Sequence, residues 1–218
     1  MSIIQSTPII TYVASLGRMC HTATFLKSSN LKKCSYPFDW IFSTPDMIVD
    51  VLTDDFKKFL DRKNYIPHKN EPHNSTIAGH KLYNPILFNH HNPRLDKDYN
   101  YFTRCVGRFR TLLSKVDTKL FIVFYRNGDK YGNKETIYRL NRILAKKTTN
   151  YHLLIIQHSV VKVKPTTTIK SEGNICFMDF TSLTPTNGVR FDSENDNIRF
   201  SEEIYKLYKF EISDDIKE

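Results

Sequence analysis

The sequence predicts an α/β fold, a single domain with a mainly parallel sheet and helices on both faces of that sheet. Three near-continuous apolar runs of strand length lie in the second half: Lys119 to Tyr125, Tyr151 to Gln157 and Asn174 to Phe180. A helical pattern from Asn133 to Lys147 separates the first two runs. Strands that are apolar on both faces and alternate with helices are typical of a largely parallel sheet that is covered on both sides.

The first half adds a strand and three helices, and one more helix closes the chain. An apolar, β-branched run predicts a strand from about Ile9 to Ala14, and a helical pattern follows from about Met19 to Ser28. Thr44-Pro45-Asp46 predicts the start of a second helix, because a capping hydroxyl is followed by a proline in the first turn and then by an acid. Apolar residues at helical spacing indicate further helices from about Lys97 to Val116 and from Ser201 to Tyr208.

No linker divides the 218 residues, so we expect one domain over residues 1–218. The polar stretch from about Lys63 to Asn84 predicts a long surface excursion, and long irregular segments are often functional. Lys81 to Phe88 contains a candidate short strand.

Composition indicates a globular protein, since 40% of the residues are hydrophobic. No apolar run approaches the roughly 20 residues of a membrane span, and the N-terminal residues read as a strand rather than a signal peptide. The four cysteines are sparse and none pair at Cys-x-x-Cys spacing, which favours free thiols in a reducing compartment and disfavours a structural zinc site. No nucleotide-binding glycine pattern is present. We therefore expect an intracellular, cytoplasmic protein (host cytoplasm if viral) without a cofactor.

The formal net charge of +9 would attract nucleic acid or an anionic membrane surface. However, the lysines and arginines are spread along the whole chain, without a compact basic run. Nucleic acid is thus a possible partner that the pattern does not favour. The sequence does not determine the oligomeric state.

Cys20 lies where a reactive cysteine would be expected. The first predicted strand breaks at Ser15-Leu16-Gly17, and the helical pattern starts within a residue or two of Cys20. The start of a helix presents unpaired backbone N–H groups and a partial positive charge. Such a position favours the thiolate and predicts a lowered pKa for Cys20.

His90 is the candidate general base, because the pKa of histidine lies near neutrality. Its neighbour His91 would point to the opposite side of the chain, so at most one of the two faces a given site. His91, His152 or His158 could take the place of His90, and a histidine pair on a loop is often only solvent-exposed. The spacing of the histidines matches no metal-binding pattern, so we expect no metal.

Three more charged residues are candidates for the site. Asp39, between Phe38 and Trp40, needs a partner if it is buried, and the alternative is that it caps a turn or a helix. Arg104 and Arg108 lie on one helical face, where they either form a solvated face, bind an anionic group of a substrate, or pair with carboxylates such as Asp39.

Four motifs resemble a known family in order and spacing: Ser15-Leu16-Gly17-x-x-Cys20, Tyr36-Pro37-Phe38-Asp39-Trp40, Phe88-x-His90 and Arg104-x-x-x-Arg108-Phe109. The chain is similar, over about residues 9–124, to a family of predicted papain-like cysteine peptidases. This domain of unknown function occurs in bacteria, in some eukaryotes and in large DNA viruses.

The resemblance implies a cysteine hydrolase that acts on a peptide, isopeptide or acyl bond of a protein or acyl substrate. Cys20 would be the nucleophile, His90 would take and return its proton, and Asp39 would orient the imidazole. Backbone N–H groups around Gly17 and Cys20, in the turn that starts at Ser15, would form the oxyanion hole.

Two departures keep alternatives open. His90 follows Cys20 by 70 residues, whereas the histidine of papain proper lies roughly 130 or more residues after its cysteine. The alternating second half also suits a doubly wound sheet better than the α+β fold of papain, which remains the alternative fold class. The alternative functions are a non-peptidase α/β enzyme acting on a phosphate- or glycan-containing substrate, with Arg104 and Arg108 as its anion-binding residues, and a basic binding protein.

Overall fold

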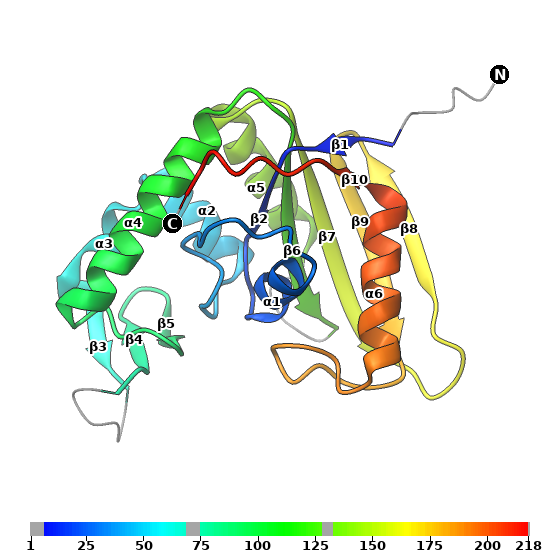
Figure 1. Ribbon diagram of the computed structural model, residues 1–218. Helices are drawn as coiled ribbons and strands as arrows, with labels where there is room; N and C mark the ends of the chain where they lie inside the picture. The colour runs from blue at the N-terminus through cyan, green and yellow to red at the C-terminus, as the bar shows by residue number, and fades with distance from the viewer. Residues whose placement is uncertain (1–6, 69–74, 128–132, 218) are drawn as a thin grey trace.

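The computed structural model describes residues 7–68, 75–127 and 133–217, and a five-stranded sheet forms its centre (Figure 1). The strand order is β2-β6-β7-β9-β8. The strands are β2 (Tyr12–Ser15), β6 (Lys119–Arg126), β7 (Tyr151–Val160), β8 (Thr167–Glu172) and β9 (Ile175–Ser182). All neighbours pair in parallel except β8, which runs antiparallel to β9 at the edge. The predicted mainly parallel sheet is confirmed.

Helices cover both faces of this sheet. Successive side chains of β6 point to opposite sides, so they pack against different layers. Phe121 and Val123 pack in one core with residues of α2 (Pro45–Thr53), α4 (Asp96–Ser114) and α5 (Lys134–Lys147). Ile122 and Phe124 pack in a second core with residues of α1 (His21–Ser28) and α6 (Glu194–Leu207). The near-continuous apolar sequence of the strand reflects burial against both layers (Figure 1).

A second, small antiparallel sheet lies beside α4 and holds β3 (Tyr65–Pro67), β4 (Ala78–His80) and β5 (Asn84–Phe88). The short helices α3 (Lys57–Leu60) and η1 (Arg62–Asn64) precede it. The excursion expected at about residues 63–84 therefore contains β3 and β4, and its residues 69–74 lie outside the described part of the chain. The short strand expected between Lys81 and Phe88 is β5.

Several boundaries differ from the prediction for local reasons. The first predicted strand is divided into β2 and β1 (Ile9–Ile10), and β1 pairs with β10 (Lys209–Phe210) instead of the main sheet. Helix α6 begins seven residues before the predicted start, because its first turn is polar and shows no apolar period. The edge strand β8 was missed since four of its six residues are exposed and its sequence is mostly polar.

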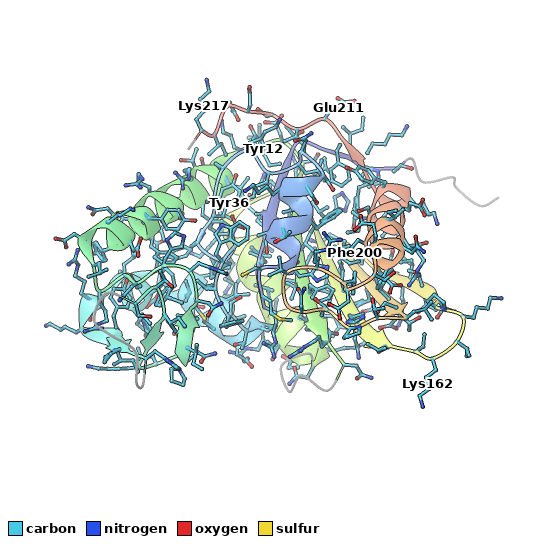
Figure 2. The ribbon with its side chains drawn as sticks, turned by 60° about the horizontal axis from the view of Figure 1, so that its bottom comes forward. Tyr12, Tyr36, Lys162, Phe200, Glu211 and Lys217 are labelled. Atoms are coloured by element: carbon cyan, nitrogen blue, oxygen red, sulfur yellow. The ribbon has the colours of Figure 1, made fainter. Side chains whose placement is uncertain are left out.

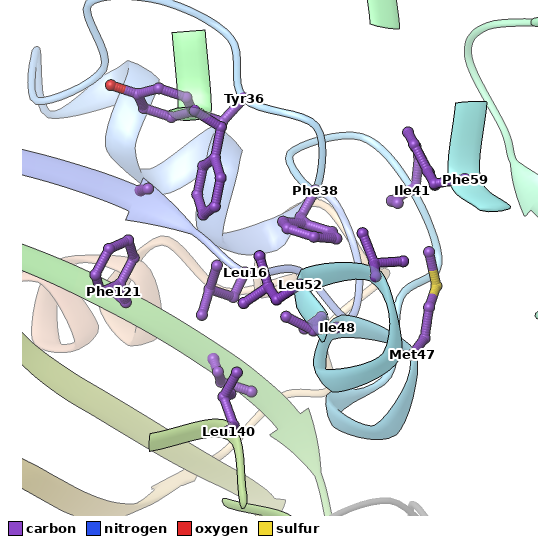
Figure 3. Packing of buried hydrophobic residues seen from close by; sticks show 14 of the residues in the cluster. Leu16, Tyr36, Phe38, Ile41, Met47, Ile48, Leu52, Phe59, Phe121 and Leu140 are labelled. Atoms are coloured by element: carbon purple, nitrogen blue, oxygen red, sulfur yellow. The ribbon is translucent and has the colours of Figure 1, made fainter. Parts of the chain in front are cut away.

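The turn after β2, the following loop and α2 share one packed core (Figure 3). Leu16, Phe38, Ile48 and Leu52 converge there, and all four side chains are buried. The ring of Phe38 also lies 5.7 Å from that of Phe109 on α4. This packing joins the carboxyl end of β2, which leads to Cys20, to the segment that carries Asp39.

Charged side chains are distributed over the outer surface of the molecule. Lys162 and Lys217 project outward at opposite ends of the view in Figure 2. No helix in the described part of the chain is long and apolar enough to cross a membrane.

Candidate active site

The turn after β2 is built by Ser15 and Gly17. The Gly17 N–H donates to Ser15 Oγ over 3.0 Å, and the Gly17 backbone has a φ of 83°. A Cβ on Gly17 would lie 1.9 Å from Ser43 Oγ, which itself donates to the Leu16 carbonyl. Only glycine fits this left-handed conformation and this close approach. Because the Gly17 N–H is used inside the turn, oxyanion donors at this site have to come from the start of α1.

Cys20 lies directly before α1, at the N-cap position but without a side-chain capping hydrogen bond, close to the helix start that the sequence predicts. Its carbonyl accepts the Thr24 N–H over 2.8 Å, and its side chain is only 5% exposed. Burial raises the pKa of the Cys20 thiol to about 11; a backbone hydrogen bond lowers that pKa, and the negative charge of Asp39 raises it. The prediction of a lowered pKa is therefore wrong for this conformation, because the loss of solvent around the thiolate outweighs the effect of the helix start.

Asp39 belongs to a segment that we call the Asp39 loop, residues 31–41. The carboxylate is 1% exposed, and its partners include the Lys32 ammonium at 2.5 Å and the Tyr36 N–H at 2.8 Å. Lys32 also donates to the Cys34 carbonyl. The expectation that a buried Asp39 needs a partner is confirmed, and a lysine from its own loop is one of its partners.

His90 lies beside Trp40, the residue that follows Asp39. A β-bridge between Ile41 and Phe88 brings the end of β5 next to the Asp39 loop. The ring centres of Trp40 and His90 are 6.3 Å apart, edge to face, and His90 is exposed. Within the described part of the chain we find no hydrogen bond between the Cys20 thiol and the His90 imidazole.

His91 has a different environment, as the prediction of opposite orientations requires. Its Nδ1 lies 3.3 Å from Asp98 Oδ1, and its ring stacks on Tyr101 with the ring centres 4.1 Å apart. His91 thus contacts α4 and not Trp40.

Arg104 and Arg108, the two candidate arginines of α4, have different environments. Arg104 is exposed, whereas Arg108 is buried, donates from Nε to the Ser35 carbonyl over 2.9 Å and contacts Cys105 Sγ over 3.2 Å. Arg108 therefore supports the Asp39 loop, and the interpretation of a solvated face is wrong for it. A substrate-binding role of Arg104 and Arg108 stays a prediction.

Sequence analysis missed a group of rings beside Cys20, which we call the histidine–aromatic cluster: His21, Phe124, His158 and Phe191. His21 and His158 both stack on Phe124, with ring centres at 4.6 and 5.8 Å, and Phe191 contacts both imidazoles edge to face. Burial lowers the pKa of His21 to about 3 and that of His158 to about 4. The one sequence signal was the position of His158 at the end of a buried strand.

No three histidine, cysteine or carboxylate side chains within residues 7–68, 75–127 and 133–217 are grouped so that they could hold a metal ion. Of the five histidines between residues 68 and 91, His73 lies outside the described residues, and His80 is buried with its Nε2 3.0 Å from the Lys58 carbonyl.

Comparison with known families identifies the matched region. Residues 11–160 match a family model described as "Putative papain-like cysteine peptidase". The chain belongs to this family. The matched range contains Cys20, Asp39 and His90 and ends with β7, so that β8, β9 and α6 lie beyond it. No curated protein and no solved structure matches the chain.

Proposed function

We propose that the protein is a cysteine hydrolase that uses Cys20 as nucleophile on a peptide, isopeptide or acyl bond. One observation supports the proposal above the others: of the three cysteines within the family match, Cys20 is the one at the N-cap position of α1, after the carboxyl end of the parallel strand β2. In open α/β sheets, ligands bind outside the carboxyl ends of the strands.

The proposed reaction divides the work among three residues. His90 takes the Cys20 proton, and the thiolate attacks the substrate carbonyl carbon to form a tetrahedral intermediate. N–H groups at the start of α1 stabilise its oxyanion, and His90 then protonates the leaving group as the thioester forms. Water, deprotonated by His90, releases the acyl group and restores the thiol.

Asp39 has a positioning role in this proposal. Because Lys32 and the Tyr36 N–H hold its carboxylate, Asp39 fixes the loop whose Trp40 ring contacts the His90 imidazole. A buried thiol with a pKa of about 11 is protonated at neutral pH. The proposal therefore requires substrate binding to bring Cys20 and His90 into contact.

Alkylation by iodoacetamide, followed residue by residue with mass spectrometry as a function of pH, tests the proposal. We expect Cys20 to react below pH 8 when a substrate-like acyl compound is bound, and His90→Ala to remove that reactivity. Cys34 is the internal control, because burial also raises the pKa of its thiol. Equal reactivity of Cys20 and Cys34 under all conditions would refute the assignment of Cys20 as the nucleophile.

Turnover provides the second part of the test. A Cys20→Ser variant should lose the hydrolysis of an activated ester such as p-nitrophenyl acetate while keeping the wild-type unfolding transition. If the variant keeps full activity, the alternative of a non-peptidase α/β enzyme replaces the proposal, and the mostly parallel sheet supports that alternative. Salt-sensitive binding of nucleic acid with an inert Cys20 would instead favour a basic binding protein.

A further inference from the structure

The most exposed large apolar side chain in the described part of the chain lies in the loop between β7 and β8. Val163 is 76% exposed, and two other residues, Val160 at the end of β7 and Leu183 directly after β9, are each more than half exposed. Elsewhere in the described part, only Leu82 and Val116 among the large apolar side chains reach that exposure. Because protein surfaces usually carry such residues singly, three at one place indicate a contact surface.

Backbone pairing brings the two loops that carry these residues together, and we call Val160, Val163 and Leu183 the valine edge. Val160 pairs in register with Ser182, the residue before Leu183, and the Val161 N–H donates to the Ser182 carbonyl over 2.9 Å. Figure 1 shows the β7–β8 loop and the loop after β9 at the same end of the molecule, where the parallel strands end.

The tip that carries Val163 projects from a hydrogen-bonded base. The Thr181 N–H donates to the Thr166 carbonyl over 3.0 Å, and the Thr166 N–H donates to Thr181 Oγ1 over 2.6 Å. Lys162 points away from the body of the molecule in Figure 2. Because the base already holds the tip in place, binding through the tip requires little ordering of the loop.

Lysines flank the exposed valine on both sides. Lys162 and Lys164 are exposed, and no carboxylate in the described part of the chain forms an ion pair with either. Arg126, from the end of β6, lines the same hollow as Val160. The segment 159–166 contains no acidic residue. The valine edge is therefore apolar and surrounded by positive charge.

Four carboxylates flank the loop after β9, and two of them are already engaged. Asp196 is buried and accepts backbone N–H groups at the start of that loop, and Glu194 forms an ion pair with Arg190. Asp179 and Asp192 are exposed. With these two counted against the three cations beside the valine edge, the net charge there is still positive.

We propose that the valine edge docks on the surface of an anionic lipid bilayer. Val163 and its apolar neighbours insert at the boundary between headgroups and acyl chains, while Lys162 and Lys164 stay at the level of the lipid phosphates. Each lysine near an anionic membrane surface strengthens such binding. Nucleic acid offers the same negative charge, but its phosphate backbone gives protruding aliphatic side chains no apolar contact, so the valines favour the bilayer.

Co-sedimentation of the full chain with lipid vesicles tests this surface at about 100 mM salt, where charges within about 10 Å still interact. The probes are phosphatidylcholine vesicles with about 30% phosphatidylserine and vesicles of phosphatidylcholine alone. We expect at least about tenfold tighter binding to the anionic vesicles, because two lysines lie at the contact.

Two variants separate the apolar part of the contact from the charged part. Val163→Asn removes the inserted side chain without a change of charge and should weaken binding about tenfold. The double variant Lys162→Ala/Lys164→Ala should weaken binding to anionic vesicles by roughly 10- to 30-fold. Val116→Asn is the matched control and should bind like the wild type, because Val116 is 71% exposed and lies before β6, at the opposite edge of the sheet.

All of these side chains are exposed, so each variant should keep the wild-type unfolding transition. Absence of binding to the anionic vesicles, or equal binding to both kinds of vesicle, would overturn the inference. So would equal binding by Val163→Asn and Val116→Asn. A dimer that Val163→Asn dissociates would also overturn it, since a second copy would then cover the valine edge.

Single-stranded DNA is the competing probe. Tighter binding to DNA than to vesicles, lost in the lysine variant and kept in Val163→Asn, would assign the surface to nucleic acid and refute the bilayer. The valine edge does not depend on the proposed hydrolase. Cys20→Ser should bind vesicles like the wild type, so failure of one proposal is distinguishable from failure of the other.

Discussion

The Asp39 loop and the histidine–aromatic cluster stabilise buried polar groups in different ways. Asp39 stays charged beside the Lys32 ammonium and accepts the Tyr36 N–H. His21 and His158 lie among phenylalanine rings, where burial lowers the pKa of each and keeps both imidazoles neutral. The stability of the Asp39 loop therefore depends on a partner residue, whereas the stability of the histidine–aromatic cluster depends on pH.

Asp39→Asn is expected to have one of the two largest effects on stability. The variant leaves the Lys32 ammonium, 10% exposed, without its carboxylate, and breaking a buried ion pair on one side costs about 3–5 kcal/mol. Urea denaturation measures the loss in the free energy of unfolding. Asp50→Asn is the control, because Asp50 pairs with Lys58 at the surface, where an ion pair contributes about 0–1 kcal/mol. If both variants lose the same free energy, the Asp39 loop does not depend on this pair.

Gly17→Ala tests the turn after β2, next to both regions. The positive φ strains an alanine by about 1–3 kcal/mol, and overpacking against Ser43 adds about 1–3 kcal/mol. Gly107→Ala is the matched control, since nothing lies within 4 Å of a Cβ in this α4 position, and there alanine should stabilise the helix by about 0.5–1 kcal/mol.

Adding Ser43→Ala to Gly17→Ala sharpens this result. Loss of Ser43 Oγ removes the closest contact but leaves the backbone strain. The double variant should therefore recover only part of the lost free energy. Full recovery would show that the positive φ is not a constraint at this turn.

Lowering the pH should affect the histidine–aromatic cluster more than the Asp39 loop. Both folded-state pKa values, about 3 for His21 and about 4 for His158, lie below the unfolded value of about 6.5. The unfolded chain therefore takes up protons first. The contribution of the two neutral histidines to the free energy of unfolding is fully present above about pH 6.5. It decreases as the pH falls towards 4 and 3, by no more than about 1.4 kcal/mol per pH unit for each histidine.

Unfolding free energies between pH 7 and 4.5 check this slope. His158→Phe should flatten it, whereas Gly107→Ala, which changes no ionisable group, should keep the wild-type slope. A wild-type slope that His158→Phe leaves unchanged would contradict a neutral buried His158.

His90→Ala should produce the smallest change in stability. The ring is exposed, and surface substitutions usually change the free energy of unfolding by less than about 0.5 kcal/mol. The same variant should abolish the proposed hydrolysis. A loss of more than about 1 kcal/mol on denaturation would show that His90 has a structural role beside Trp40.

Local chemistry explains which parts of the fold were predictable. The Thr44 cap of α2 was identified from Thr-Pro-Asp, and the Thr44 hydroxyl accepts the Met47 N–H over 3.2 Å. The buried strands β6, β7 and β9 were identified from their apolar runs. The edge strand β8 and the first turn of α6 were not, since polar residues in both conceal the period that marks an element.

The site shows the same limit. The sequence placed Cys20 at a helix start, and the structure has it there. The pKa of the thiol, the support of the Asp39 loop by Arg108 and the stacking of both His21 and His158 on Phe124 all depend on segments far apart in the chain. No spacing in the sequence encodes these contacts.

By itself, then, the sequence determined the family, the alternation of strands and helices and the position of Cys20 at the start of α1, because backbone hydrogen bonding and side-chain period are local properties. Only the tertiary structure decided the electrostatics. Whether an ionisable group is charged depends on the solvent and the partners around it, and packing of distant segments sets both. That packing buried the Asp39–Lys32 pair, left His158 Nδ1 without a partner and removed water from the Cys20 thiol.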